Sequence, residues 1–297
     1  MDGVLLIDKP SGPTSHDVVA RVRSVSGERS VGHTGTLDPR ATGLLALVLG
    51  KATRLASVLS GSDKTYLATV RLGSTTDTDD ADGSVTSTSG SRPDDHAIDA
   101  ALGQFIGAFD QMPPNHSAKK VGGHKAYDLA RRAEPVVLKT APVTVRSLHR
   151  TGRDGDLISL VVTASAGFYV RALARDLGQA LGCGAHLDAL RRTTVGRFDV
   201  AQALPLDAAE RLGPALAAHI LSPADALGDF PSVTVNADGL RRVLHGNPLS
   251  PDHLQGRAIP VAGSAPSMRV RVLADDGHLL ALAASRGGAL HPTVVLG

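Results

Sequence analysis

Apolar residues form two short uninterrupted runs near the start of the chain, at residues 4–7 and 43–49. Runs of this length are typical of strands that are buried on both faces. Residues 65–72 alternate instead, and their even positions, from Tyr66 onward, are apolar. A period of two residues predicts a strand with one buried face.

Helical signals occur at three places. Thr14 followed by Asp17 has the pattern of a capping box and predicts a helix through residues 16–24. Residues 52–59 predict a second helix. In residues 169–181 the apolar side chains recur every three or four positions, which predicts a third helix.

The second half of the chain contains two hairpin patterns. Strand-like segments at 143–150 and 157–164 flank an Arg-Asp-Gly-Asp turn, and segments at 269–274 and 278–283 flank Asp-Gly. Prolines near residue 230 indicate a boundary between a main part and a small C-terminal domain. Because regular alternation of strand and helix is missing, the sequence predicts an α+β fold with a mixed, largely antiparallel sheet flanked by helices and loops.

The composition is that of an ordinary globular protein, with 297 residues of which 42% are hydrophobic and 20% charged. No run of 18 or more apolar residues is present, and the apolar start of the chain is too short for a signal peptide. We therefore expect a cytoplasmic protein without a membrane partner. Cys183 is the single cysteine, and we interpret it as a small buried side chain.

Charge is unevenly distributed, although the formal net charge is only +2. Eight aspartates and one arginine lie between residues 77 and 110, and the acidic, loop-rich segment 77–95 predicts a mobile surface excursion. From residue 119 to residue 150, eight lysines and arginines oppose two acids. This basic block is either a solvated face or a footprint for a polyanion, which makes a phosphate backbone a candidate partner.

Common cofactor and metal motifs are absent from the sequence. Residues 43–51 resemble a phosphate-binding loop, but six residues separate the two glycines where four are needed, and Ala52 follows the lysine. No histidine pair has the His-Glu-x-x-His spacing, and no Gly-x-Ser-x-Gly motif occurs. The sequence therefore predicts no catalytic metal ion and no serine hydrolase.

Five separated motifs occur in order along the first two hundred residues: Asp-Lys-Pro at 8–10, Gly-His-Thr-Gly-Thr-Leu-Asp-Pro at 32–39, Lys-Thr-Tyr at 64–66, Gly-Phe-Tyr-Val-Arg at 167–171 and Leu-Arg-Arg-Thr at 190–193. Taken together, they resemble the TruB family of bacterial tRNA pseudouridine-55 synthases. Gln-Met-Pro-Pro at 111–114 and Ser-Ala-Lys-Lys at 117–120 are similar to a second block of the same family.

The resemblance implies an isomerase that converts uridine 55 in the T-loop of tRNA to pseudouridine without a cofactor or a metal ion. It implies a pseudouridine synthase domain at residues 1–230, with an RNA-clasping insertion at about 111–140. Residues 231–297 are implied to form a small PUA-like, β-rich RNA-binding domain, short as in actinobacterial members. The T-arm of tRNA is the implied partner, and no obligate protein partner is indicated.

Asp38 aligns with the family's catalytic aspartate. In the local sequence, Asp-Pro is also a common turn opener that does no chemistry. A carboxylate suits the reaction, because cleavage of a glycosidic bond builds positive charge on the sugar that an ionised acid can stabilise. The resemblance implies an ion pair between Arg171 and Asp38, which would keep the acid ionised near neutral pH, whereas a surface helix charge is the alternative for Arg171.

The resemblance also assigns six other residues to the site. Tyr66 is implied to stack on the target base and handle its proton, and His33 to occupy the place that the flipped uridine vacates. Lys9, with Pro10, supports the site, and Tyr169 and Leu190 line the base pocket. Core or turn positions are the alternatives for these residues. A further set of basic residues is expected to contact the RNA backbone, namely Lys64, Lys119, Lys120, Arg131 and Arg132.

Two other classes of function stay open at the level of the sequence. The chain could bind the T-arm and help tRNA fold without needing catalysis, but binding alone requires no acid beside RNA phosphates. A nucleoside hydrolase would need a second placed carboxylate, which the sequence does not identify.

Overall fold

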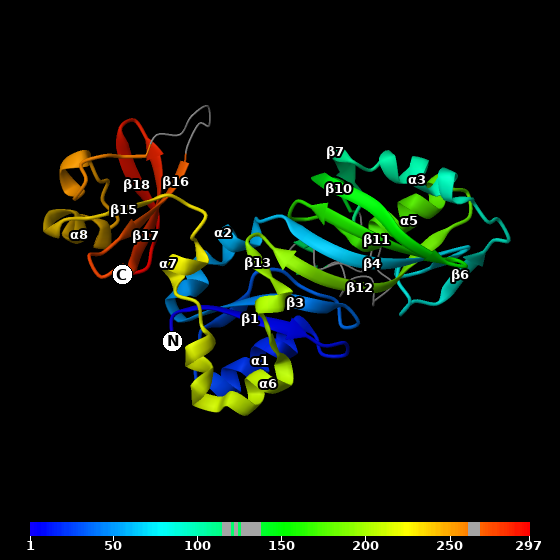
Figure 1. The fold of residues 1–297 in the computed structure, drawn as a ribbon, viewed down its shortest axis with the longest axis horizontal. Coiled ribbons are helices and arrows are strands. Elements are labelled where there is room, and N and C mark those ends of the chain that lie inside the picture. The colour runs from blue at the N-terminus through cyan, green and yellow to red at the C-terminus, as the bar shows by residue number, and fades with distance from the viewer. Residues whose placement is uncertain (115–119, 122–123, 126–137, 261–267) are drawn as a thin grey trace.

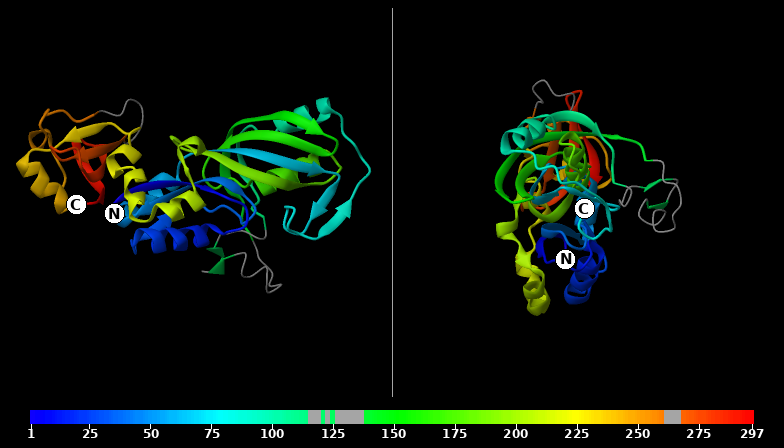
Figure 2. Two further views of the ribbon diagram at one scale, coloured as in Figure 1. Left: turned by 60° about the horizontal axis from the view of Figure 1, so that its bottom comes forward. Right: turned by 90° about the vertical axis from the view of Figure 1, so that its right-hand side faces the viewer.

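The computed structural model describes residues 1–114, 120–121, 124–125, 138–260 and 268–297. A large sheet with flanking helices forms the body of the molecule, and a four-stranded sheet near the C-terminus forms a smaller lobe (Figure 1). The views in Figure 2 show the same division from two further sides.

The large sheet has ten strands among the described residues, and eight of them follow the order β14-β1-β3-β12-β4-β11-β10-β7. Its antiparallel pairs outnumber two parallel ones, β1 with β14 and β3 with β12. The predicted mixed, largely antiparallel sheet is therefore confirmed. Its strands are β1 (Gly3–Lys9), β2 (Val31–His33), β3 (Thr42–Leu49), β4 (Lys64–Leu72), β7 (Gly107–Gln111), β10 (Ala141–Asp154), β11 (Leu157–Ala164), β12 (Ala185–Val195), β13 (Phe198–Asp199) and β14 (Leu204–Pro205).

The uninterrupted apolar runs are explained by burial on both faces of the sheet. In β1, Val4 and Leu6 join one hydrophobic cluster, whereas Leu5 and Ile7 join another on the opposite face. β3 is divided in the same way between the two clusters. β4 alternates as predicted, and it directs Tyr66 to a third cluster.

Helices cover the two halves of the sheet separately. α1 (Ser15–Ser26) begins with the predicted capping box and packs with α6 (Leu206–Leu212) over β1 and β3. α3 (Asp95–Gly103) and α5 (Val170–Ala180) cover the half that contains β4, β10 and β11, where Cys183 is buried. The helix predicted at 52–59 is only partly correct, because Gly50–Leu55 is a 3₁₀ segment and α2 (Ala56–Ser60) alone is α-helical.

The remaining elements are short or belong to the C-terminal lobe. β5 (Ser74–Thr76) pairs with β6 (Val85–Thr88), and β8 (Lys120–Val121) pairs with β9 (His124–Lys125). After α7 (Pro223–Ala226), the lobe consists of α8 (Ala237–Leu244) and the sheet β15-β16-β17-β18. These strands are β15 (Ser232–Thr234), β16 (Met268–Leu273), β17 (Leu279–Arg286) and β18 (Ala289–Val295).

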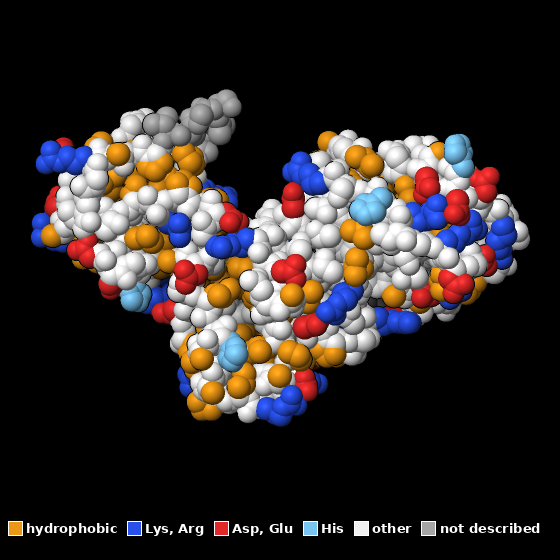
Figure 3. Space-filling model, in the orientation of Figure 1, with side chains coloured by type: hydrophobic (Ala, Val, Ile, Leu, Met, Phe, Trp, Pro, Cys, Tyr) orange, Lys and Arg blue, Asp and Glu red, His pale blue; other side chains and the backbone are white. Residues whose placement is uncertain are grey.

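The C-terminal lobe is attached to the body through an apolar contact. Leu279, Leu282 and Leu296 share a hydrophobic cluster with Val4 and Leu6 of β1. The surface is hollowed between the C-terminal lobe and the body (Figure 3). Charged side chains of both signs are interspersed over this face. Within the described part of the chain, no helix has the length and apolar character needed to cross a membrane.

Candidate active site

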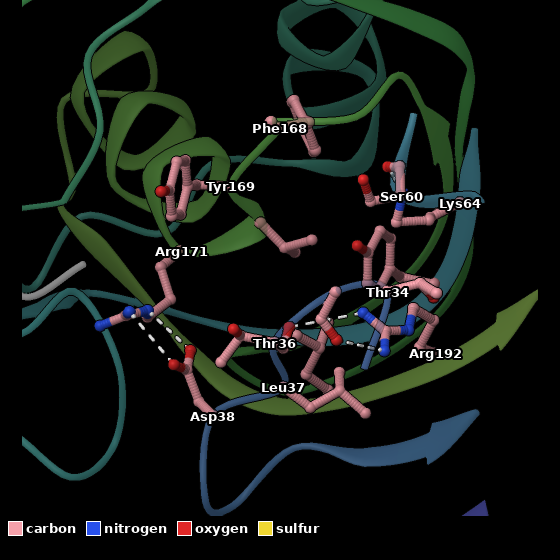
Figure 4. Close-up of a pocket in the computed structure, with 15 residues that line it drawn as sticks. Thr34, Thr36, Leu37, Asp38, Ser60, Lys64, Phe168, Tyr169, Arg171 and Arg192 are labelled. Atoms are coloured by element: carbon pink, nitrogen blue, oxygen red, sulfur yellow. Dashed lines mark hydrogen bonds and ion pairs between the residues drawn. The ribbon is translucent and has the colours of Figure 1, made fainter. Parts of the chain in front are cut away.

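A cavity of about 280 Å³ lies where β4 and β12 meet the loop 34–38 and the segment 167–171. Two arginines, Arg171 and Arg192, lie at opposite ends of it (Figure 4). Pockets for drug-sized ligands measure about 300–1,000 Å³, so this volume suits a small group such as one nucleotide.

Asp38 lies at the edge of this cavity, in a turn. Its carbonyl accepts a hydrogen bond from the Ala41 amide at 3.1 Å, as the Asp-Pro pair predicts. Two hydrogen bonds between the Ser15 hydroxyl and the Leu37 backbone, of 2.8 and 3.0 Å, hold the turn against α1. The Asp38 side chain is 45% exposed, so a ligand in the cavity can reach it.

Arg171, in the first turn of α5, forms the ion pair with Asp38 that the resemblance implies. Its Nε lies 3.1 Å from Oδ2 of Asp38, and its Nη2 lies 3.5 Å from Oδ1. Although the Asp38 side chain is 45% exposed, the surrounding protein atoms partly desolvate its carboxyl and raise its pKa, and the nearby Arg171 charge acts in the opposite direction. Arg171 therefore offsets part of the cost of keeping an ionised acid in this site.

A second carboxylate, that of Asp80, forms an ion pair with Arg171. Asp80 Oδ2 lies 3.2 Å from Nη1, which also donates to the Thr78 carbonyl at 3.2 Å. One turn along α5, Arg175 pairs with Asp79 at 3.0 Å. These aspartates belong to the segment predicted to be a mobile surface excursion. Their ion pairs place both side chains against α5, 18% and 17% exposed, so the predicted surface position is wrong for this part, whereas the mobility stays a prediction.

Lys9 is fully buried beneath the Asp38 turn. Its Nζ donates hydrogen bonds to the carbonyls of Pro10, Pro13 and Pro39, at 2.9, 2.8 and 2.9 Å. Burial lowers the pKa of its amine to about 8. The lysine thus ties the loop after β1 to the residue that follows Asp38, which is a supporting position.

Tyr66 and Lys64 enter the cavity from the same face of β4. Tyr66 is 8% exposed, and it lies opposite Arg192 of β12, which also lines the cavity. Lys64 is 6% exposed, and its Nζ donates to the carbonyls of Ser60 and Ser62 at 2.9 and 2.6 Å. Lys64 thus lies in the buried wall of the cavity, and its contact with the RNA backbone stays a prediction.

Tyr169 and Leu190 line the cavity, as the resemblance implies. His33 ends β2 and packs edge-to-face against His16, with ring centroids 5.7 Å apart. It is not among the described residues that line the cavity. The structure therefore groups Asp38 with Arg171, Tyr66, Tyr169 and Leu190 around the cavity, whereas His33 lies outside the cavity lining.

The other predicted RNA contacts cannot be placed on this surface. Lys119, Arg131 and Arg132 lie outside the described residues, and for Lys120 the structure describes only its backbone, in β8.

The sequence motifs did not identify three residues that organise the site. Asp80 lies in a segment that was assigned to a loop, and Gln111 and Arg192 lie in recognised motifs without an assigned role. Gln111 is buried, and its side-chain amide makes two hydrogen bonds with the Tyr169 backbone, at 2.8 and 3.1 Å. Gln111 and Arg192 are identified by the burial of their polar side chains, and burial cannot be read from the motifs themselves.

Asp38 is the only acidic side chain among the described residues that line the cavity. In the same described ranges, no group of three or more histidine, cysteine, aspartate or glutamate side chains is arranged to hold a metal ion. The arrangement offers one carboxylate, paired with an arginine, beside a nucleotide-sized space.

Comparison with known families shows which class of protein has this fold and site. Residues 23–170 match the N-terminal domain of the TruB family of pseudouridylate synthases, and residues 171–227 match the C-terminal domain of tRNA pseudouridylate synthase B. Fold and site thus define a pseudouridylate synthase, an isomerase.

Full-length relatives place the chain within that class. It is 46% identical to tRNA pseudouridine synthase B of Thermobifida fusca over 99% of this chain and 98% of the relative. The corresponding protein of Dinoroseobacter shibae is 40% identical, over 99% and 95%. The chain belongs to the TruB family.

Solved structures agree with this assignment at the level of the fold. A chain in the crystal structure of a Cbf5-Nop10-Gar1 complex has a TM-score of 0.76 at 26% identity, with coverage of 99% of this chain and 85% of that chain. A chain in the structure of an H/ACA RNP bound to a substrate RNA containing 2'-deoxyuridine has a TM-score of 0.74 at 25% identity, with the same coverage. The predicted pseudouridine synthase fold with a small C-terminal β-sheet domain is confirmed, whereas an actinobacterial type for that domain stays a prediction.

Proposed function

We propose that the chain isomerises uridine 55 in the T-loop of tRNA to pseudouridine, with Asp38 as the catalytic residue. The observation that carries this proposal is the lone carboxylate, held by Arg171 at 3.1 Å, at the edge of a cavity of about 280 Å³. A uridine inside a folded loop hides the atoms that react, so the nucleotide is flipped into the cavity.

The reaction exchanges one bond to the sugar for another. The bond between N1 and C1′ breaks with its electron pair leaving on the base, and the ionised Asp38 stabilises the positive charge that develops on the sugar. The base then turns and C5 bonds to C1′. The proton on C5 must leave and N1 must gain one, so the reaction needs no external reactant.

The cavity suits this sequence of steps better than it suits hydrolysis. A glycoside hydrolase usually employs two carboxyl groups that flank the bond, one of them as an acid. Here Asp80 contacts the far side of Arg171 instead of lining the cavity. Tyr66, Tyr169 and Leu190 supply aromatic and apolar surface that retains the detached base.

Several residue roles form part of the same proposal. Tyr66 stacks on the flipped base, Lys9 supports the Asp38 turn, and His33 fills the space that the base leaves in the RNA loop. The basic residues Lys119, Lys120, Arg131 and Arg132 contact the T-arm backbone from an insertion at about 111–140. The C-terminal lobe at 231–297 acts as a PUA-like RNA-binding domain.

Position-resolved mapping of pseudouridine on an unmodified tRNA transcript tests this function. We expect one modified position, uridine 55, and no product on a matched transcript that carries cytidine there. Release of free uracil would favour a hydrolase instead, and tRNA binding without any product would favour a folding or binding module.

A further inference from the structure

Arg192 is a buried cation in the cavity wall to which the proposed function assigns no role. It is 2% exposed, and its guanidinium donates to three carbonyls: Nε to Leu44 at 2.8 Å, Nη2 to Gly35 at 3.0 Å and Nη1 to Thr36 at 3.4 Å. No ion pair with a carboxylate connects Arg192 to any residue in the described ranges. A guanidinium retains its charge when buried, so this cation lies in the cavity wall without a formal counter-charge.

The fold makes specific room for Arg192. Gly43 of β3 lies opposite Arg192 of β12, and its φ of 98° is a conformation that favours glycine. A Cβ atom at this position would collide with the Arg192 backbone. The approach of the two strands therefore depends on a glycine, and it places the guanidinium against the loop that ends in Asp38.

One ionisable hydroxyl faces this cation inside the cavity. Arg192 is the register partner of Tyr66 across β12 and β4, and both side chains line the cavity. Burial raises the pKa of the Tyr66 phenol, and the nearby Arg192 charge acts in the opposite direction. Lys64 adds a second cation at the same end, since a Cβ built on Gly35 would lie 3.4 Å both from its Cε and from Arg192 Nη1. The end of the cavity that holds Lys64 and Arg192 is thus positively charged, and the opposite end holds the Asp38–Arg171 pair (Figure 4).

We propose that Arg192 is a positioning residue that holds the Tyr66 hydroxyl and stabilises its phenolate while Tyr66 carries the proton of C5 to N1. This inference rests on the proposed function. When the bond between N1 and C1′ breaks, the base departs as an anion, and the Tyr66 hydroxyl donates its proton to N1. After C5 has bonded to C1′, the phenolate takes the C5 proton and becomes a phenol again, so protons and charge balance without another reactant.

A double-mutant cycle separates this role from a purely structural one, because Arg192 also holds the loop at Gly35 and Thr36. Single-turnover rates on the tRNA transcript are measured for Arg192→Lys and Arg192→Gln, alone and combined with Tyr66→Phe. With Tyr66 present, we expect a loss of about tenfold for the lysine variant and about a hundredfold for the glutamine variant, which lacks the charge. In the Tyr66→Phe background, each substitution should cost no more than about threefold, because the hydroxyl on which Arg192 acts is gone.

The controls make the cycle decisive. Arg191→Lys alters the neighbouring arginine of β12, whose Nη2 pairs with Asp8 at 2.7 Å outside this cavity, and it should leave the rate unchanged. If Arg192→Gln fails to fold, the cycle with Arg192→Lys still tests the inference. Equal losses with and without the Tyr66 hydroxyl would overturn the inference and leave Arg192 a loop support. An inactive wild-type chain would instead contradict the proposed function itself.

Discussion

Asp38 carries its charge in surroundings that oppose it. Burial raises the pKa of its carboxyl, Asp80 and Asp82 act in the same direction, and Arg171 and Lys9 compensate only in part. Under the proposed function, the Asp38–Arg171 ion pair serves the reaction more than the stability of the fold, as is common at catalytic sites.

The Asp38→Asn variant should for this reason be more stable than the wild type at pH 7. The folded-state pKa of Asp38 lies above its value in the unfolded chain, so the wild type loses stability relative to the variant as the pH rises through the folded pKa. Melting temperatures measured from pH 4 to pH 8 should show a difference that is largest at neutral pH and shrinks toward pH 4. A variant that is less stable at neutral pH would show that the ion pair with Arg171 outweighs burial.

At the scale of elements, α5 connects the site to the start of the predicted insertion. Its start is held by Gln111, at the end of β7, through the two hydrogen bonds to Tyr169. Farther along the helix, Arg175 donates to the Met112 carbonyl at 2.8 Å. The end of β7 thus fixes the helix that presents Arg171 to Asp38.

Replacement of Gln111 by leucine should loosen this connection. The Tyr169 amide would lose its acceptor, at a cost of about 1–3 kcal/mol, whereas the Tyr169 carbonyl still accepts a hydrogen bond from the Leu173 amide. We expect kcat to fall about tenfold while tRNA affinity changes little, since Arg171 is displaced from Asp38 but the RNA-binding surface is not. Gln104→Leu, on the exposed end of α3, is the matched control. A loss confined to KM would show that Gln111 serves RNA binding instead.

Local patterns predicted most of the elements, and the exceptions have physical causes. The capping box of α1, the alternation of β4 and the spacing of α5 are properties of neighbouring residues, and the structure confirms them. β12 was missed because register shifts after Leu187 and Arg192 interrupt its period of two. The site depends on contacts such as Asp80 with Arg171, 91 residues apart, and only the family resemblance made part of it predictable.

For the whole molecule, the contact between lobe and body decides how the chain unfolds. Leu282 of β17 packs into the cluster shared with β1, whereas Leu280 packs into the core of the lobe itself. Arg271 adds hydrogen bonds to the carbonyls of Ala224 and Phe230, at 2.9 and 2.8 Å. An apolar interface of this kind couples the two parts, so we expect a single unfolding transition.

Leu280→Ala and Leu282→Ala provide a matched test of this coupling by calorimetry. Each removes a buried leucine, and each should destabilise the protein by about 2–5 kcal/mol. With coupled parts, both variants should show one transition at a lower temperature. A separate early transition in Leu280→Ala alone would show that the lobe unfolds independently.

The central claim is that Asp38 performs the chemistry and is not needed for RNA binding. Its most direct test compares the wild type with Asp38→Asn in release of tritium from uracil-C5-labelled tRNA transcript, with tRNA affinity measured on the same preparations. The amide keeps the shape of the side chain and removes the charge used in the transition state. We predict no detectable release by the variant and an affinity within about tenfold of the wild type. Substantial release by the Asp38→Asn variant would contradict the account.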